Sequence, residues 1–385
     1  MALYISNQIS SYTHANIEIP KESDNSLKMI EGEDLNNFQY QDKDRIFEIS
    51  EKPESEPEMI FNQNKNLIVL ILSGRDNFKT RTMIKQTWAK NEPNVFFMVG
   101  QHYCPWPADT LWDPHGCSLK LNHTASPINF TAIDHTESDD KIYLGGGLEK
   151  ARDHYSRGVI NSIVRYRRLQ DGVTEKLKKE EKVVTLPMVD TYNSLTKKLK
   201  LSLRWVHEMS TLSLGKNSSE NTYHPKWVLK IDDDSIARVT SLEAYLQENY
   251  PINKHPNLYL GWMGEMKKVL HSGKWAEKDY KQKFYPTYAN GCAGYILSWD
   301  LIKYISVNFD NLIEYHNEDA STGIWLHNSY LSKNISYVRG NKIQGVRGAG
   351  QCRATNRKQE LLLLGHNMNV ARLRYCWYRY FNERH

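Results

Sequence analysis

A short apolar run that ends in three carboxylates restricts the possible folds of this chain more than any other segment. Residues 227–231 read as a strand, and Asp232 to Asp234 follow them directly. In open α/β sheets the ligand crevice lies at the carboxyl ends of the strands. Mg²⁺ and Mn²⁺ favour carboxylate oxygens, and Mg²⁺ is commonly bound by one or two carboxylates together with substrate phosphates. The run therefore predicts a cation site at a strand end, although three consecutive acids are also typical of a solvated turn.

Further apolar runs alternate with helical patterns along the chain. Strands are expected at 67–72, 95–99, 183–187, 258–262 and 294–297. Helices are expected at 81–90, 195–206, 300–307 and 323–328. Residues 67–72 are apolar throughout, which predicts a strand buried on both faces, as in a parallel sheet. The alternation predicts an α/β fold in which helices sandwich a mainly parallel sheet.

Composition divides the chain into a lead, a core and an insertion. Residues 1–60 are polar and acidic in patches, which predicts a mostly disordered, stem-like lead. The remaining residues, 61–385, contain enough apolar sequence for one large domain. Between 104 and 166 Pro, Gly, His and Asp are frequent and the periodic pattern is lost. We therefore expect a surface insertion there.

Cysteines and sequons point to the secretory pathway. None of the five cysteines forms a CxxC pair, which argues against a structural zinc site. Sequons for N-glycosylation occur at Asn122, Asn129, Asn217 and Asn334. In an oxidising compartment Cys104 and Cys117 could form a disulfide.

Charge and hydropathy give no sign of a nucleic-acid partner or of a membrane-spanning segment. The net charge of +5 is scattered along the chain, so we expect no nucleic-acid partner. The sequence has no run of about 20 apolar residues, which a membrane-spanning helix needs, and no signal-peptide pattern at its start. The sequence alone therefore predicts no transmembrane segment.

Several segments, taken in chain order, resemble the β-1,3-galactosyltransferase family of inverting, sugar-nucleotide-dependent hexosyltransferases with a GT-A fold. They are RTMIKQTW at 81–88, FFMVG at 96–100, DTYNSLTKK at 190–198, WVLKIDDD at 227–234, KW at 274–275, YPTY at 285–288, GCAGYILS at 291–298, EDASTG at 318–323, and the surroundings of His366. The resemblance covers roughly residues 65–378. Lys85 and Ser194 stand where the family pattern has Arg and Asn.

The resemblance implies a Rossmann-type GT-A fold with residues 61–385 as the catalytic domain. It implies an inverting transferase that moves a hexose, galactose or an N-acetylhexosamine, from a UDP-sugar to the 3-hydroxyl of an acceptor glycan on a glycolipid or glycoprotein. Mn²⁺ or Mg²⁺ would be the cofactor. The resemblance also implies a type II membrane protein of the Golgi lumen, so membrane association is expected although the sequence shows no anchor.

The acidic triplet would hold the cation. Asp234 is expected to be the direct ligand, and Asp232 to be a ligand or to face the ribose. Asp233 is assigned to donor binding, but alternation along an extended segment would send it to the other side. His366 would be a further ligand by resemblance, or else a surface histidine on a turn.

The later acid pair would supply the base. By resemblance Asp319 takes the proton of the acceptor hydroxyl and Glu318 orients or packs beside it. Acids are also favourable in a first helical turn without any catalytic role.

Further donor contacts are assigned to Arg81, Asp190, Tyr192 and Lys198, where Asp190 could instead cap a helix and Lys198 could instead lie on a solvated face. Trp275 and Trp299 could stack on an acceptor sugar, or belong to the core.

Two other functions fit parts of the sequence. The first is a catalytically inactive, glycosyltransferase-like glycan-binding protein, which would be expected to lose Asp234 or Asp319. The second is a metal-dependent phosphohydrolase, which would need a second cluster of acids or histidines. The sequence retains both acids and offers no convincing second cluster.

Overall fold

The computed structural model describes residues 61–111, 113–117, 156–212, 224–291, 294–345 and 363–382, so the lead at 1–60 lies outside the described residues. The chain divides into two compact units. Among the described residues the first unit contains Gly74–Asp76 and Val99–Leu195. The second contains Asn77–Met98, Thr196–His385 and the segment that ends at Ser73.

A mainly parallel sheet with the strand order β10-β6-β9-β4-β1-β2-β3 forms the centre of the fold. Its strands are β1 (Leu67–Leu72), β2 (Val95–His102), β3 (Val183–Val189), β4 (Trp227–Asp232), β6 (Leu258–Gly261), β9 (Tyr295–Ser298) and β10 (Ser336–Arg339). β1 pairs in parallel with β2 and β4, and β10 pairs in parallel with β6. By contrast, β9 is antiparallel to its neighbours β4 and β6. The predicted α/β class, of the GT-A type, is confirmed.

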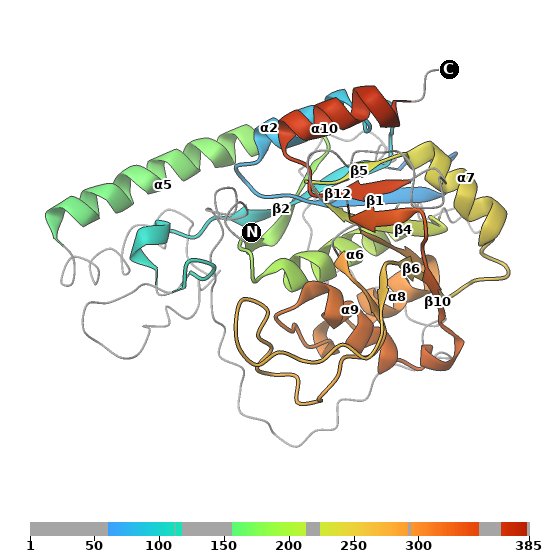
Figure 1. Cartoon of the computed structure of the whole chain (residues 1–385). Helices are drawn as coiled ribbons and strands as arrows, with labels where there is room; N and C mark the ends of the chain where they lie inside the picture. Colours follow the sequence, from blue (N-terminus) through green and yellow to red (C-terminus); the bar gives the residue numbers. More distant parts are fainter. Residues whose placement is uncertain are drawn as a thin grey trace. The chain divides into compact units, whose positions relative to one another are not determined.

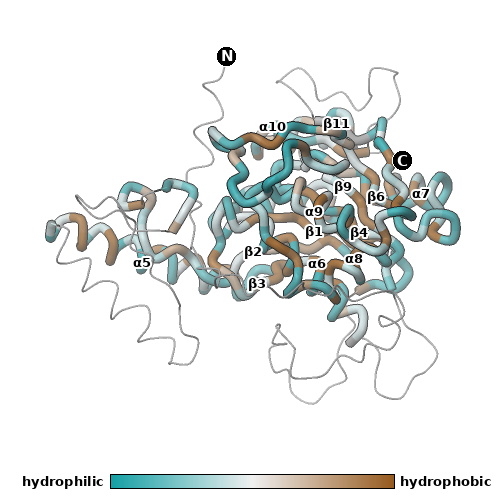
Figure 2. The backbone as a smooth tube through the Cα atoms, turned by 90° about the horizontal axis from the view of Figure 1, so that it is seen from below, coloured by the Kyte–Doolittle hydropathy of each residue, from teal (hydrophilic) through white to brown (hydrophobic). Residues whose placement is uncertain are grey.

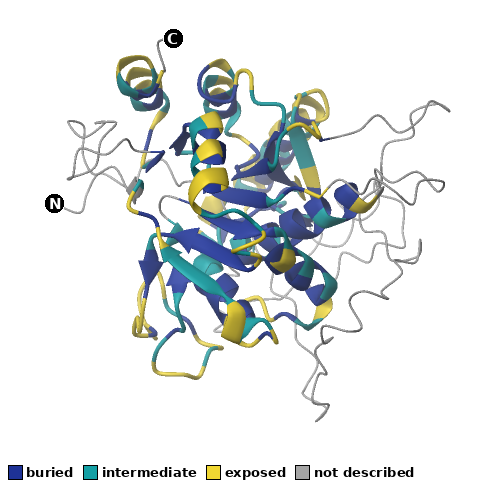
Figure 3. Cartoon of the chain, turned by 90° about the vertical axis from the view of Figure 1, so that its right-hand side faces the viewer, coloured by how far each residue is buried: buried dark blue, intermediate teal, exposed yellow. Residues whose placement is uncertain are grey.

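Burial of the central strands follows from their sequences. All six residues of β1, LIVLIL, are buried, as expected for a strand covered on both faces. β4 is buried from Trp227 to Ile231 and reaches partial exposure at Asp232. Figure 2 shows hydrophobic stretches along these strands, and Figure 3 shows exposed residues on the outer turns of the helices. The acids therefore lie where the strand leaves the core.

Helices of the second unit flank this sheet. They are α2 (Phe78–Gln86), α6 (Leu195–Leu212, which begins at the boundary residue), α7 (Val239–Asn249), α8 (Trp299–Val307), α9 (Glu318–His327) and α10 (Val370–Cys376). The unit also contains the short 3₁₀ helices η4 (Phe309–Asn311) and η5 (Ser332–Asn334) and the π-helix η6 (Trp377–Phe381). α9 begins at Glu318, whereas the sequence predicted a start at 323. Both acids of the pair thus lie in the first helical turn, where the helix dipole favours negative charge.

Two small sheets complete the second unit. β11 (Ile343–Gly345), β12 (Leu364–His366) and β5 (Ile236–Ala237) form one, and β7 (Met263–Gly264) pairs with β8 (Tyr288–Ala289) in the other. α10 packs against α2, as Figure 1 shows. The sequence did not predict these strands, because two or three residues are too few to show a period.

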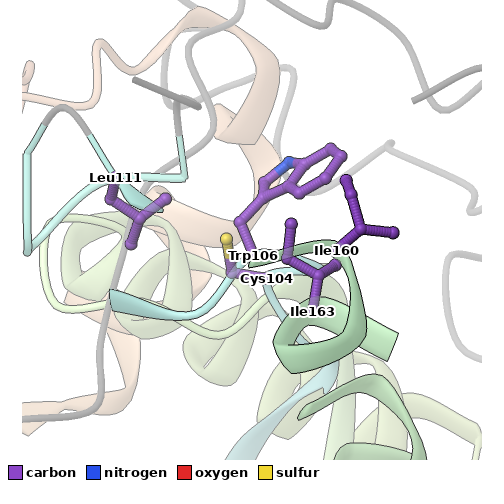
Figure 4. Close-up of a cluster of buried hydrophobic side chains, with 5 residues drawn as sticks. All are labelled: Cys104, Trp106, Leu111, Ile160 and Ile163. Carbon is purple, nitrogen blue, oxygen red and sulfur yellow. The ribbon is translucent and has the colours of Figure 1, made fainter. Parts of the chain in front are cut away.

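The first unit contains a long helix and a disulfide. The helix α5 (Arg157–Leu177) follows the turn η2 (Ala108–Thr110), and the predicted bond between Cys104 and Cys117 is present. Figure 4 shows the small core that Cys104 and Trp106 form with Leu111, Ile160 and Ile163.

The irregular pattern read from the sequence between 104 and 166 ends earlier in the structure, because α5 begins at Arg157, and the insertion itself stays a prediction. The buried face of α5 includes Arg167 and Gln170, so its apolar period is broken. Most of the predicted insertion lies outside the described residues. Within them, none of the helices is both long enough and apolar enough to cross a bilayer.

Candidate active site

The ends of β4 and β12 bring three possible cation ligands together. Asp232, Asp234 and His366 each offer a ligand atom, and these atoms all lie within 4.8 Å of one another. The side chains are half-buried. Elsewhere in the described ranges no second group of three such residues is found. The cluster joins the two parts of the sequence that were predicted to hold a cation.

Backbone pairing explains how His366 reaches the acidic triplet. β12 pairs antiparallel with β5, the short strand that follows the triplet, with Gly365 opposite Ile236. The amide of Met368 donates to the carbonyl of Asp234 at 2.8 Å. The C-terminal segment is therefore attached to the triplet by main-chain hydrogen bonds on both sides of His366.

The side chains of Asp234 and His366 are suited to a shared cation. Oδ1 of Asp234 is buried and makes no hydrogen bond within the described part of the chain, although Nε2 of His366 lies 3.1 Å away. Burial alone would lower the pKa of His366, but the neighbouring Asp234 carboxylate outweighs it and the pKa is raised. A buried oxygen without a hydrogen bond, facing an imidazole nitrogen, is what a cation between them would satisfy.

Asp233 makes its side-chain hydrogen bonds away from this cluster. Strand alternation is not the reason, because β4 ends at Asp232 and Asp233 lies in the turn that follows. Its Oδ2 accepts from the Ser73 hydroxyl at 2.7 Å and from Nδ2 of Asn77 at 2.8 Å. Burial raises the pKa of Asp233 to about 6, against the lowering effect of both hydrogen bonds. The side chain thus holds the connection between β1 and α2. Its assignment to donor binding stays a prediction.

Two other predicted donor-binding residues meet at the same serine. Nη1 of Arg81 donates to the Ser73 hydroxyl at 3.1 Å, and Nζ of Lys198 donates to the Ser73 carbonyl at 2.9 Å. Arg81 is 0% exposed and Lys198 is 2% exposed, so Lys198 does not lie on a solvated face. These hydrogen bonds fix the end of β1, and contact of the two side chains with a donor stays a prediction.

Asp190 and Tyr192 belong to the first unit. The buried Asp190 carboxylate accepts from the Gly100 amide at 3.0 Å, and a side chain at Gly100 would collide with Asp190. Asp190 does not cap α6, because that helix begins at Leu195. The ring of Tyr192 lies 5.4 Å from that of His115. Contact of either residue with a nucleotide stays a prediction.

The acid pair at the start of α9 has two different environments. Oδ2 of Asp319 accepts from the Gly291 amide and Oδ1 accepts from the Ala320 amide, both at 3.0 Å. Glu318 instead uses its oxygens on side chains. The Tyr295 hydroxyl donates to Oε1 at 2.6 Å, and Nζ of Lys230 donates to Oε2 at 2.8 Å. Burial raises the pKa of Glu318, and the ammonium of Lys230 opposes that rise.

Lys230 is a site residue that the sequence analysis did not single out. Its Nζ lies 3.0 Å from Oδ1 of Asp232 as well as 2.8 Å from Oε2 of Glu318. Burial would lower the pKa of Lys230, but the two carboxylates raise it above its ordinary value. The signal was available in WVLKIDDD, since a lysine inside a buried strand needs an acidic partner.

The two tryptophans assigned to an acceptor platform lie in different settings. Trp275 is 50% exposed, and its carbonyl accepts from Nδ2 of Asn317, beside the acid pair, at 3.3 Å. Trp299 begins α8 and stacks on His224 at 4.7 Å between ring centroids. Sugar binding by either ring stays a prediction.

Comparison with known proteins relates the chain to a family. Residues 162–335 match the family model described as Galactosyltransferase. The chain is 26% identical to a UDP-GalNAc:beta-1,3-N-acetylgalactosaminyltransferase 2 of Danio rerio over 213 residues. These residues make up 55% of this chain and 38% of the relative. It is 33% identical over 138 residues to beta-1,3-galactosyltransferase 6 of Mus musculus, which is 36% of this chain and 38% of the relative.

A plant protein shows the same likeness. Identity to a hydroxyproline O-galactosyltransferase of Arabidopsis thaliana is 29% over 162 residues, 40% of this chain and 22% of the relative. The matches thus span 38% or less of the length of these relatives. The family model and the relatives nevertheless agree, and the chain is a relative of the β-1,3-galactosyltransferases that carries a galactosyltransferase-family segment at residues 162–335.

Proposed function

We propose that this chain is an inverting, UDP-sugar-dependent β-1,3-hexosyltransferase. It moves a hexose from the nucleotide to the 3-hydroxyl of an acceptor glycan, with Mn²⁺ or Mg²⁺ at the Asp232, Asp234 and His366 cluster. The names of the relatives support transfer of galactose or N-acetylgalactosamine in β-1,3 linkage. Because those names differ in the sugar, the donor hexose is left open among galactose and the N-acetylhexosamines.

One observation carries the proposal. The cation cluster and the acid pair come from different parts of the sequence, yet Nζ of Lys230 lies 3.0 Å from Asp232 and 2.8 Å from Glu318. Asp319 is the next residue along α9. The two halves of the expected chemistry are therefore joined through one buried ammonium within a single unit. Placement on opposite faces would have excluded the mechanism.

The chemistry needs charge neutralisation on one side and a base on the other. A bound divalent cation would offset the negative charge that grows on the diphosphate as UDP leaves. Asp234 and His366, together with Asp232, would hold it. Asp319 accepts the proton of the acceptor hydroxyl while that oxygen bonds to the anomeric carbon and the sugar–phosphate bond breaks. Attack opposite to the leaving UDP inverts the anomeric configuration.

The chemical types of the three candidate ligands bear on the choice of metal. Two carboxylates suit Mg²⁺ or Mn²⁺, whereas an imidazole nitrogen suits transition metals. A set with both favours Mn²⁺, so transfer should be faster with Mn²⁺ than with Mg²⁺ at equal concentration. From the family resemblance we expect the protein in the Golgi lumen, with an acceptor on a glycolipid or glycoprotein.

A donor screen with two carboxylate variants tests the proposal. UDP-galactose, UDP-N-acetylgalactosamine and UDP-N-acetylglucosamine are supplied with simple β-linked acceptors and Mn²⁺, and the product is analysed for its linkage. Asp319→Asn should lower kcat on the order of 10²–10⁴-fold, the usual contribution of a general base, and leave UDP binding intact. Asp234→Asn should weaken Mn²⁺-dependent UDP binding.

Asp310→Asn is the matched control, because Asp310 is an exposed acid of the same unit outside the cluster. It should leave kcat unchanged. Normal transfer by Asp319→Asn would refute the assignment of the base. A wild-type chain that binds Mn²⁺–UDP but neither transfers nor hydrolyses any of the donors would instead indicate a glycan-binding protein without turnover.

A further inference from the structure

The buried ammonium of Lys230 lies where three elements of the site meet. It projects from β4, its side chain is 3% exposed, and it contacts one carboxylate of the acidic triplet and one of the α9 acid pair. A Cβ at Gly291 would lie 3.5 Å from Nζ of Lys230, 3.5 Å from Glu318 and 3.5 Å from Asp319. The ammonium therefore also lies directly beside the loop that carries Gly291.

Each of the two contacts of Lys230 fixes a different carboxylate. On one side Lys230 holds Asp232, which is 35% exposed and belongs to the cation cluster. On the other side it holds Glu318, whose second oxygen accepts from Tyr295, and Tyr295 in turn contacts the Thr322 hydroxyl at 3.1 Å. Glu318 is thus fixed by both oxygens, and so is the first turn of α9.

Fixing Glu318 has a consequence for its neighbour. Asp319 follows in the same helical turn, and the Gly291 amide that donates to its Oδ2 comes from the loop beside Lys230. The carboxylate of Asp319 is therefore located by two connections, the helix that Glu318 anchors and the loop beside the ammonium. Glu318 is bound by the ammonium of Lys230 and the hydroxyl of Tyr295, whereas among the described residues Asp319 accepts only from the two backbone amides of Gly291 and Ala320. Asp319 therefore remains the proposed base of the pair.

We propose that Lys230 is a positioning residue that fixes the base Asp319 relative to the cation cluster by binding Asp232 and Glu318 at the same time. The inference rests on the proposed function and adds to it that Lys230 sets the distance between the leaving group and the base. Lys230 itself neither contacts the reacting atoms nor exchanges a proton in this scheme. Its role is geometric, since a misplaced base costs rate without loss of substrate binding.

A pair of isosteric replacements separates this role from folding. Lys230→Met alone leaves the buried Glu318 carboxylate without its cation, and such a variant can fail to fold. The double variant Lys230→Met with Glu318→Gln removes both charges, and the side-chain amide oxygen that it introduces still accepts from Tyr295. Lys230→Arg keeps the charge and can span both carboxylates. Lys200→Met is the matched control, because Lys200 is another buried lysine, 6% exposed, paired with Glu314 at 2.8 Å.

Folded variants, checked by circular dichroism and thermal melting, are compared in three assays. They are Mn²⁺–UDP binding by calorimetry, hydrolysis of the UDP-sugar by water, and transfer to the acceptor. The double variant should keep the Mn²⁺–UDP dissociation constant within about threefold and lose on the order of 10²-fold in kcat for transfer. Hydrolysis should fall by less, so the ratio of transfer to hydrolysis drops. Lys230→Arg should recover most of the transfer rate, and Lys200→Met should keep the wild-type ratio.

Outcomes distinguish this inference from the proposed function. If the wild-type chain transfers a hexose but the double variant transfers it equally well, or changes transfer and hydrolysis by the same factor, the positioning role is refuted and the function stands. If the double variant loses Mn²⁺–UDP binding instead, Lys230 supports the cation cluster alone, which also refutes the inference. If the wild-type chain neither binds Mn²⁺–UDP nor transfers, the proposed function fails and the inference fails with it.

Discussion

Two neighbouring buried tyrosines allow a sharp test of the electrostatics beneath the site. Tyr259 on β6 and Tyr295 on β9 are both 0% exposed, and their ring centroids lie 5.5 Å apart. The Tyr295 hydroxyl donates to the carboxylate of Glu318 at 2.6 Å, whereas the Tyr259 hydroxyl accepts from the Ala289 amide at 3.0 Å. The two residues thus share burial and surroundings but differ in the charge of their partner.

Replacement of each by phenylalanine should therefore give different costs. A hydrogen bond to a charged group contributes about 1.5–3 kcal/mol to stability and one between neutral groups about 0.5–1.5 kcal/mol. We expect Tyr295→Phe to lower the free energy of unfolding by about 2 kcal/mol and Tyr259→Phe by about 1 kcal/mol. For a unit of this size each kcal/mol lowers Tm by about 2–4 °C.

Urea denaturation and thermal melting of both variants at pH 7 measure the difference. The wild-type m value serves as the control that the unfolded state has not changed. Equal losses in the two variants, or a larger loss for Tyr259→Phe, would refute the conclusion that Glu318 is a buried carboxylate that depends on its donors.

Three further predictions concern other parts of the chain. Burial lowers the pKa of His207 from 6.5 to about 4, so between these pH values the unfolded chain binds a proton that the folded chain does not. The free energy of unfolding should therefore fall by about 2 kcal/mol from pH 7 to pH 5. In urea titrations the free energy of unfolding of His207→Gln should depend less steeply on pH. Loss of the Cys104–Cys117 bond, which spans 13 residues, should destabilise the first unit by about 2–3 kcal/mol in the Cys104→Ser, Cys117→Ser double variant; an unchanged urea midpoint of that unit would contradict this. Asn334 is exposed in η5, so a eukaryotic host that secretes the protein should attach a glycan there. The intact mass of the wild-type protein should therefore exceed that of the Asn334→Gln variant by the mass of one glycan, after correction for the substitution itself.

Long periodic segments of the chain were predictable because their own sequences encode them. β1 is a run of six apolar residues and is buried throughout, so its position followed from hydrophobicity alone. The acidic triplet and the Glu-Asp pair were likewise found by type and order of residues. Helix boundaries were less accurate, because α9 gains its first turn from contacts of Glu318 and Asp319 that lie far away in sequence.

Several assignments required the fold. Arg81, Lys198 and Asp233 all form hydrogen bonds with Ser73 at the end of β1. The sequence could not predict these contacts, because a basic or acidic side chain looks the same in sequence whatever its partner is. Which strands and helices pack around the residue decides that partner, and contact of the three side chains with a donor stays a prediction.

Local sequence was sufficient to predict an α/β chain with a strand that ends in a group of acids, since apolar runs and consecutive acids are recognisable over short distances along the chain. The packing of distant segments settled which residues stand together there. It brought His366 to Asp234 through strands of two or three residues that carry no periodic signal. It also placed Lys230 between Asp232 and Glu318, because a charge inside a buried strand is stable only where distant parts of the chain supply its partners.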